Sequence, residues 1–511
     1  MKTKSRSLKT GILQGIRVLD LSRMLSGPYA TMLLADHGAE VIKIESSEGD
    51  TSRRSGPFNE SDKKKEWSGY FVSLNRNKKS INLNLKNEED LIFLKKLIEK
   101  SDVLVENFRP GVMKRLGLSF DEVSKINSRI VYGSISGFGS EFFGESPYKN
   151  WPSYDVVAQA MGGLISLTGF DERTPLKVGP GIADIFSGSL LSFGLLASIL
   201  KSRTSGQAQY VEVAMYDAIV SMCERAVYQY DLNKVIPKPE GNGHPMLAPF
   251  GIYNAKDGFV AIGIVEDTYW NVLKKIIDCQ ALLNDSKYGT IALRAKNRNE
   301  LNKQINLWTM KFSKNELVNL LGGKIPFGPV NNVKEIFEDP HVRERNMILE
   351  IGQPFKDGKN WKVAGNPVKF KGFPSLSFTP PGLNEHKKFY ADNLDSIHSN
   401  QQSLLFEPEQ KDYQCKITFC SKDQKVLYFK ACSFTWLKSK ETYLICSVRK
   451  IDLAGLKSKD TTATFYFSKA TEVEDDCKQS VDFLNKKLSH KNFSDISFVN
   501  TKVEMLVSVK T

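Results

Sequence analysis

Several features that mark common functional classes are missing from this sequence. It contains no run of roughly 18 uninterrupted apolar residues, so a membrane role has no support in the sequence. The seven cysteines are an odd number without Cys-x-x-Cys spacing, and no apolar signal segment precedes them. This usage favours a reducing, cytoplasmic location. The basic start, MKTKSRSLKTG, is too short for a transit peptide because a strand is expected after about ten residues.

Metal and nucleotide motifs are scarce as well. The six histidines are scattered, with His37 at an expected helix end and His244 and His341 in expected loops, so we expect no metal site. No P-loop or G-x-S-x-G elbow is present. The stretch GNGHP, residues 241–245, is rich in glycine but lacks the G-x-G-x-x-G order, which makes a dinucleotide loop improbable and is compatible with a flexible lid.

The charge balance is basic, but the charges are dispersed. Lys and Arg number 71 against 58 Asp and Glu, a formal net charge of +13. Positive and negative residues alternate along most of the chain instead of forming one basic block. This pattern disfavours nucleic-acid binding and remains compatible with local pockets for phosphate groups.

Apolar segments with strand and helix character alternate over the first 220 residues. Their spacing suits right-handed crossovers, so we expect an open, mostly parallel sheet covered by helices, with ligands at the carboxyl ends of the strands. The expected strands are 16–22, 41–45, 79–85, 102–108, 130–139 and 209–215, and the expected helices are 26–38, 88–101, 120–128 and 185–203.

The 511 residues suffice for two to four domains. The fold class expected is α/β: a Rossmann-like large domain, a smaller α+β domain and an extra C-terminal α+β module. A strand in the segment 326–395 could rejoin the first sheet. The C-terminal segment 411–511 combines strands with a helix at 473–488. The expected boundaries are 11–224 for the first part of the large domain, 225–325 for the small domain, 326–395 for the return, 396–410 for a linker and 411–511 for the module.

The stretch VGPGIADIFSG, residues 178–188, places Asp184 between a glycine-rich turn and a long apolar segment. Taken by residue type alone, the position favours an N-cap, because an Asp side chain accepts hydrogen bonds from free backbone N–H groups. A carboxylate there can also serve as a nucleophile toward an acyl group. Gly179, Gly181 and Gly188 would leave room for a bulky ligand.

Several long stretches, in one order, resemble the class III CoA-transferase family, also called the CaiB/BaiF family. They are GIRVLDLSRMLSGPYATMLLADHGAEVIKIE, NRNKKSINLNL, SDVLVENFRPGVMKRLGL, YDVVAQAMGG, VGPGIADIFSG, GQAQYVEVAMYDA, GNGHPMLAPFGIYNAKDG and IPFGPVNNVKEIF. The resemblance covers about residues 11–395, and the sequences of the motifs are similar to those of the succinate–hydroxymethylglutarate-type members. The module after about residue 400 matches no motif.

The resemblance implies an activity and an assembly. Asp184 matches the family's nucleophile, which attacks acyl-CoA to form a mixed anhydride and then an aspartyl-CoA thioester, from which CoA passes to a free, dicarboxylic-type acid. CoA is therefore implied as a substrate, with no permanently bound cofactor. Members form interlocked homodimers, so the same assembly is implied here; the dispersed charge and the lack of a long apolar run predict no nucleic-acid or membrane partner. A helix start at Asp184 would help to keep the carboxylate ionised.

The resemblance also implies CoA contacts wherever the local motif matches. Some relatives carry glutamine where this chain has Leu25, so a hydrogen bond from that side chain is lost. Arginines suit the three phosphates of CoA, although a solvated surface pair is the simpler reading of Arg109 and Arg115 from residue type alone. The implied contacts are Leu25, Ser26, Leu83, Asn84, Leu85, Lys86, Asn107, Phe108, Arg109 and Arg115.

Two further features bear on the type of activity. Related 2-methylacyl-CoA racemases carry a histidine at the position of Tyr154, and a tyrosine of ordinary pKa is a poor base at neutral pH. In transferases the loop matching Gly241 to Gly243 can close over the intermediates and exclude water. A racemase of the same fold and a non-catalytic CoA-binding protein remain the alternatives to a transferase.

Overall fold

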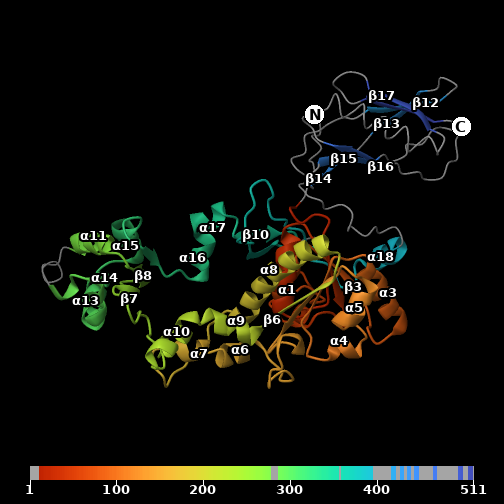
Figure 1. Ribbon diagram of the computed structural model, residues 1–511. Coiled ribbons are helices and arrows are strands. Elements are labelled where there is room, and N and C mark those ends of the chain that lie inside the picture. The colour runs from red at the N-terminus through yellow and green to blue at the C-terminus, as the bar shows by residue number, and fades with distance from the viewer. Residues whose placement is uncertain are drawn as a thin grey trace. The chain divides into compact units, whose positions relative to one another are not determined.

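The computed structural model describes residues 11–277, 286–355 and 358–394, together with seven strands between residues 416 and 509 (Figure 1). The chain divides into two compact units, Met1–Asn400 and Gln401–Thr511.

A six-stranded, wholly parallel sheet forms the centre of the first unit, in the order β3-β2-β1-β4-β5-β6. The expected α/β, Rossmann-like fold class is thereby confirmed. The strand order reverses between β1 and β4, and this is where such sheets bind ligands beyond their carboxyl ends. The strands are β1 (Arg17–Asp20), β2 (Glu40–Glu45), β3 (Lys78–Asn82), β4 (Val103–Glu106), β5 (Val131–Ser136) and β6 (Gln209–Ala214).

Both faces of the sheet are covered, which explains why its strands are short apolar runs. All four residues of β1 and of β4 are buried. On one side, Leu94 and Leu97 of α3 join Val123 of α5 in the main hydrophobic core. The helices up to residue 233 are α1 (Ser26–Asp36), α2 (Gly69–Asn75), α3 (Glu88–Glu99), α4 (Val112–Arg115), α5 (Phe120–Ile126), α6 (Asp155–Met161), α7 (Leu164–Leu167), α8 (Ile182–Ser205), α9 (Met215–Met222) and α10 (Glu224–Asn233), with short 3-10 turns at Thr51–Arg54 and Glu141–Phe143.

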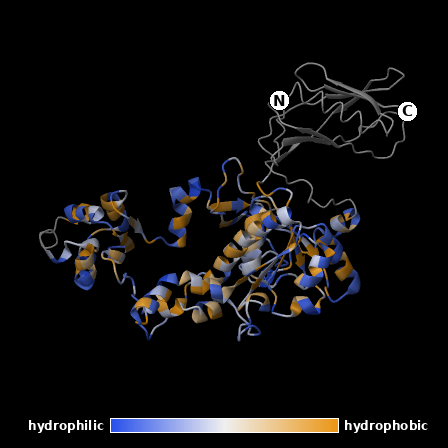
Figure 2. Ribbon diagram, in the orientation of Figure 1, coloured by the Kyte–Doolittle hydropathy of each residue, from blue (hydrophilic) through white to orange (hydrophobic). Residues whose placement is uncertain are grey.

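Helix α8 is longer than the sequence pattern predicted, since it begins at Ile182 and ends at Ser205. By length and composition it is the one described helix that is long and apolar enough to cross a membrane (Figure 2). Its Leu191 and Leu195 are fully buried, and the helix packs against α1, β5 and β6. Burial against the sheet is therefore sufficient to explain its apolar composition.

A smaller antiparallel sheet, β7-β8-β9, packs against helices through a separate core that includes Trp270, Leu273 and Leu317. Its last strand corrects one expectation: the segment expected to rejoin the first sheet pairs with β8 instead. The elements are β7 (Phe250–Ala255), β8 (Gly258–Gly263), α11 (Asp267–Ile277), a 3-10 turn at Ser286–Tyr288, α13 (Ile291–Lys296), α14 (Arg298–Thr309), α15 (Lys314–Leu321) and β9 (Phe327–Pro329).

The chain after the small sheet packs against the large one without adding a strand to it. Val363 of β11 joins Val72 in a small core, and Tyr390 of α18 donates a hydrogen bond to Glu40 Oε1 at 2.6 Å. The elements are α16 (Val333–Glu338), α17 (Pro340–Glu344), the antiparallel pair β10 (Ile348–Ile351) and β11 (Trp361–Ala364), and α18 (Lys387–Asn393).

The second unit contains two sheets, with strand orders β13-β12-β18-β17 and β14-β15-β16. The helix expected at 473–488 lies outside the described residues. The strands are β12 (Lys416–Ser421), β13 (Val426–Lys430), β14 (Phe434–Lys438), β15 (Thr442–Ser447), β16 (Thr464–Ser468), β17 (Phe493–Phe498) and β18 (Glu504–Val509).

Candidate active site

The loops that follow β1 and β4 are joined by one side chain. Asn107, directly after β4, accepts a hydrogen bond from the backbone N–H of Arg23 through Oδ1 at 2.8 Å. Its Nδ2 donates to the Arg23 carbonyl at 2.8 Å and to Ser26 Oγ at 3.2 Å. These contacts set the start of α1 at the point where the strand order reverses.

The same loop is supported from the side of β2 by buried charges. Lys43 donates to the Ser22 carbonyl and pairs with Asp50, both at 2.9 Å. Asp50 in turn accepts from the backbone N–H of Met24, which has the unusual φ of 65°. A non-glycine residue in the left-handed region is strained, and such strain persists where the surrounding contacts determine it.

Asp184 occupies the first turn of α8, but it does not cap the helix. The N-cap is Gly181, which has no side chain, and Asp184 is the third helical residue. The capping bond comes from another helix, because Asp155 Oδ1 in α6 accepts from the N–H of Ala183 at 2.8 Å. The expectation of an N-cap at Asp184 is therefore wrong, and its carboxylate is left available for other contacts.

Asp155 is itself held by a neighbour. Gln159 Nε2 donates to Asp155 Oδ2 at 2.7 Å, and Gln159 Oε1 accepts from the backbone N–H of Val178 at 3.0 Å. Helix α6 thus fixes both the glycine turn and the beginning of α8. The sequence did not reveal this role of Asp155, because nothing in its local pattern indicates a helix start nearly thirty residues away.

The glycines around Asp184 have different roles. A Cβ atom on Gly188 would lie 2.6 Å from the Ser26 carbonyl oxygen, and one on Gly181 would lie 2.7 Å from Leu25 Cδ2. These two glycines allow the start of α8 to pack closely on the start of α1. Only Gly179 of the three has no atom within contact distance of such a Cβ among the described residues. The expectation that all three leave room for a ligand is corrected accordingly.

The electrostatic surroundings of Asp184 raise its pKa to about 6, through burial first and then through the like charge of Asp155. A hydrogen-bonding interaction with the Ser26 hydroxyl opposes this rise. With a pKa near 6, roughly nine-tenths of the carboxylate is ionised at pH 7. It is then more basic than an ordinary carboxylate and still predominantly anionic, which suits a nucleophile.

Tyr70, in α2, is a residue near the candidate site that the sequence reasoning missed. Burial raises its pKa to about 12, and the charges of Asp184, Asp50 and Asp155 contribute to that rise. Its hydroxyl is therefore protonated at neutral pH and lies in the field of the candidate nucleophile. The motif SGYFVSLN carries no chemical signature that could have revealed this placement.

Four of the predicted CoA contacts, residues 83–86, follow β3. Leu83 is buried in the main core, so its side chain is not open to a ligand. Leu85 packs partly against that core, whereas Asn84 and Lys86 are exposed and share a turn in which Lys86 N donates to Asn84 Oδ1 at 3.2 Å. A CoA contact at Leu83 is thus limited to its backbone.

The basic residues predicted after β4 lie on the surface next to the loop of Arg23. Arg109 and Arg115 are exposed, and neither forms an ion pair with an acid among the described residues. The guanidinium of Arg23 lies 5.1 Å from the ring centre of Phe108. Cations without acidic partners at this edge of the sheet are suited to phosphate groups.

Three further predicted residues are not brought to Asp184 by any contact in the described part of the chain. Tyr154 precedes α6 with 66% of its surface exposed. Gly241 N donates to the Gly169 carbonyl at 3.0 Å, and a Cβ on Gly243 would face only the Glu240 carbonyl. Closure of this loop over the site stays a prediction.

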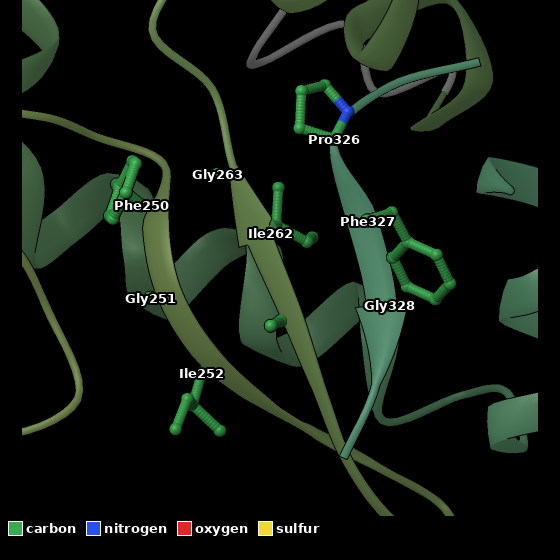
Figure 3. Close-up of a pocket in the computed structure, with 9 residues that line it drawn as sticks. Phe250, Gly251, Ile252, Ile262, Gly263, Pro326, Phe327 and Gly328 are labelled. Carbon is green, nitrogen blue, oxygen red and sulfur yellow. The ribbon is translucent and has the colours of Figure 1, made fainter. Parts of the chain in front are cut away.

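No three His, Cys, Asp or Glu side chains among the described residues are grouped so that they could hold a metal ion. A pocket of about 390 Å³ does exist, but it lies on the small sheet and contains none of the predicted site residues (Figure 3). Its lining is almost wholly apolar and includes Phe250, Ile262 and Phe327. It offers no group for acyl chemistry, so the candidate site remains the region around Asp184.

Comparisons with known proteins agree with this architecture. The model of CoA-transferase family III matches residues 13–387. The chain is 40% identical over 378 residues to a succinyl-CoA:mesaconate CoA-transferase of Haloarcula marismortui, covering 74% of this chain and 95% of that one. It is 33% identical over 383 residues to a succinyl-CoA:glutarate CoA-transferase of Mus musculus, covering 74% and 85%.

A solved structure extends the likeness to three dimensions. The crystal structure of a CaiB/BaiF family protein from Brucella suis superposes with a TM-score of 0.67 at 30% identity, and the match covers 76% of this chain and 100% of the other. The fold and the sequence thus define an α/β enzyme that transfers CoA. The chain belongs to CoA-transferase family III, and its substrates include CoA thioesters.

Proposed function

We propose that the protein moves CoA from an acyl-CoA to a free carboxylic acid with Asp184 as the nucleophile. The observation that supports this most directly is the raised pKa of a carboxylate in the first turn of a helix, at the switch point of a parallel sheet. The backbone N–H of Asp184 has no hydrogen-bond partner among the described residues. It is therefore available to a negatively charged oxygen that develops nearby.

The proposed reaction consists of four acyl transfers. A carboxylate oxygen of Asp184 attacks the thioester carbon, the C–S bond breaks, and a mixed anhydride and CoA thiolate form. The thiolate attacks the aspartyl carbonyl and releases the donor acid, leaving an aspartyl-CoA thioester. The acceptor carboxylate displaces the thiolate to form a second anhydride. The thiolate then attacks the acceptor carbonyl, which yields the new acyl-CoA and restores Asp184.

We further propose that the acids are dicarboxylates. The relatives named above are described as acting on succinyl-CoA with mesaconate or glutarate. A second carboxylate on the substrate would be compatible with the exposed cations Arg23, Arg109 and Arg115, which CoA phosphates would otherwise share. Tyr70, a protonated phenol whose pKa the charge of Asp184 helps to raise, is a candidate donor to either substrate.

We also propose a homodimer located in the cytoplasm. On α8 the side chains of Phe193, Leu196 and Leu200 are 74%, 36% and 56% exposed. A row of apolar side chains on one long helix is typical of a protein interface. Cys223 is buried and free, in keeping with a reducing environment.

The test uses the purified full chain with succinyl-CoA and a panel of free acids that includes mesaconate, glutarate and oxalate. We expect new acyl-CoA to form with at least one dicarboxylate. In a rapidly quenched reaction without acceptor, mass spectrometry of the digested protein should find CoA attached to the peptide that contains Asp184. Adduct formation on another residue would refute the assignment. Deuterium uptake at the α-carbon of a 2-methylacyl-CoA without an acceptor acid would indicate a racemase instead.

A further inference from the structure

The orientation of the Asn107 amide is fixed by the backbone hydrogen-bonding groups of Arg23. The backbone N–H of Arg23 only donates and its carbonyl only accepts, so Asn107 must place Oδ1 toward the first and Nδ2 toward the second. The amide is therefore not free to be reversed. As a consequence Asn107 Nδ2 donates to Ser26 Oγ, which is the acceptor in that contact.

This arrangement determines what the Ser26 hydroxyl does with its own proton. A hydroxyl has one proton to donate, and at Ser26 that proton is not used by Asn107. Ser26 is only 4% exposed, so water has little access to it. Gly188, one turn after Asp184 on α8, lies against the Ser26 carbonyl, and a hydrogen-bonding interaction with the Ser26 hydroxyl lowers the pKa of Asp184.

We propose that Asn107 is a positioning residue, which holds Ser26 so that the only proton of its hydroxyl is directed at the Asp184 carboxylate. This inference rests on the proposed nucleophilic role of Asp184. It assigns the Asn107 side chain a task other than the direct CoA contact that the family resemblance implies. Both amide protons of that side chain are already donated within the loop, and its Oδ1 accepts a third hydrogen bond there.

The local sequence makes the Ser26 hydroxyl important. Leu25, where some relatives carry glutamine, has no donor and packs instead against the glycine turn at Gly181. The donor available to Asp184 from this loop is thus the next side chain along. Serine supplies this donor from the first turn of α1, at the point where Gly188 brings α8 close to the Ser26 carbonyl.

The other groups facing Asp184 act in the opposite direction or are neutral. Asp155 approaches from α6 and repels the charged form, and Tyr70 of α2, whose pKa the charge of Asp184 helps to raise, is a neutral phenol. Among the described residues no cation contributes to the pKa of Asp184. Removal of the Ser26 hydroxyl should therefore make Asp184 harder to ionise, and nothing nearby would compensate.

The test is a double-mutant cycle with Ser26→Ala, Asn107→Ala and the double variant. The pH dependence of kcat/KM for succinyl-CoA is measured at saturating acceptor. In the wild type the acid limb is expected near pH 6. In Ser26→Ala it should move up by about one pH unit, the effect of losing one hydrogen bond to a charged group. Asn107→Ala should move it in the same direction, and the double variant should move it no further than Ser26→Ala.

The Michaelis constant separates positioning from binding. In Ser26→Ala and Asn107→Ala the KM for succinyl-CoA at pH 8 should stay within about threefold of the wild type, because Asp184 is ionised there. A KM that rises tenfold in Asn107→Ala while the acid limb stays in place would show a direct CoA contact and overturn the proposal. An unmoved acid limb in Ser26→Ala would overturn it as well.

Controls distinguish this inference from the proposed function. Ser202→Ala removes a buried hydroxyl elsewhere on α8, where it donates to the Arg129 carbonyl at 2.5 Å, and should leave the acid limb in place. If Asn107→Ala does not fold by circular dichroism, Asn107→Ser takes its place with the same expected result. An inactive Asp184→Asn variant together with an unmoved acid limb in Ser26→Ala would refute the positioning role alone. An active Asp184→Asn variant would refute the nucleophile itself.

Discussion

Buried acids lie on both sides of the loop that precedes α1, and they differ in what faces them. On the side of β2 and β3 each acid has a cation: Asp20 pairs with Lys78 and Asp50 pairs with Lys43, both at 2.9 Å. Burial alone would raise the pKa of Asp20, but Lys78 and Lys43 hold it well below its usual value. These acids remain charged at any physiological pH, as expected for groups that hold a structure in place.

On the side of β4 and α8, Asp184 and Glu106 have no ion-pair partner among the described residues. The pKa of Asp184 is raised to about 6, by burial and by Asp155, and burial also raises that of Glu106 to about 7. Acids whose pKa lies near neutrality are suited to chemistry or to sensing pH. The first group therefore supports the loop, and the raised pKa values of the second group fit the proposed catalytic role of Asp184.

The largest effect is expected from Asp184→Asn on the unpaired side, which keeps the shape of the side chain and removes its charge. We expect CoA transfer to fall by at least about a thousandfold, since an amide cannot form the anhydride. Transfer is measured by the appearance of the new acyl-CoA. Asp121→Asn, on the exposed first turn of α5, is the matched control and should remain active. Substantial transfer by Asp184→Asn would place the nucleophile elsewhere.

Lys78→Met tests the paired side. The ammonium group donates to Asp20, to the Pro28 carbonyl and to Asn75, and its removal leaves a buried acid without its cation. We expect the free energy of unfolding to fall by about 3 to 5 kcal/mol, measured by urea denaturation. The double variant Asp20→Asn, Lys78→Met should recover part of this loss. A loss below about 1 kcal/mol would mean that the pair does not support the loop.

Glu106→Gln tests the unpaired side through stability. Because the pKa of Glu106 is higher in the folded than in the unfolded chain, its favourable contribution is complete below about pH 4.5 and is lost as the pH rises through about 7. Between pH 5 and 8 the unfolding free energy of the wild type should therefore fall by roughly 2 to 3 kcal/mol more than that of Glu106→Gln.

The control for this comparison is Glu99→Gln, an exposed position at the end of α3. Its pH dependence of stability should match the wild type. In the wild type, Glu106 Oε2 accepts a hydrogen bond from the Phe108 N–H at 2.8 Å. Glutamine retains an oxygen that can accept this bond, so the loop after β4 should stay in place. Parallel pH curves for Glu106→Gln and wild type would show that Glu106 titrates normally.

The smallest effect is expected at the exposed cations. Arg115→Ala should raise the KM for acyl-CoA roughly three- to tenfold and change kcat little, since a surface contact to a phosphate contributes to binding and not to the chemical step. Lys114→Ala, its exposed neighbour on α4, is the control and should change KM less. An unchanged KM in Arg115→Ala would remove this residue from the CoA site.

Much of the large domain could be predicted from the sequence, because strands buried on both faces are short apolar runs and their spacing permits only parallel crossovers. The strand at 327–329 was wrongly assigned to the large sheet because its sequence carries no such pattern. It has three residues and no periodicity of its own, and only its pairing with β8 assigns it to the small sheet.

The site was predictable only in part. Ordered motifs pointed to Asp184, Ser26 and Asn107, and they remain predictions as functional residues. The roles of Asp155 and Tyr70 could not be predicted, since both depend on packing between distant segments. Asp155 of α6 accepts a hydrogen bond from the start of α8, and the charge of Asp184 raises the pKa of Tyr70 in α2. A local pattern carries no information on such contacts.

The sequence by itself determined that a glycine-flanked acid precedes a long apolar helix, and that this motif stands in the order of the CoA-transferase family. Tertiary structure decided what that acid experiences. Gly188 and Gly181 let α8 approach α1, Asp155 takes over the capping contact, and burial raises the pKa of Asp184. The physical reason is that propensity acts between neighbours in the chain, whereas desolvation and Coulomb interactions depend on neighbours in space.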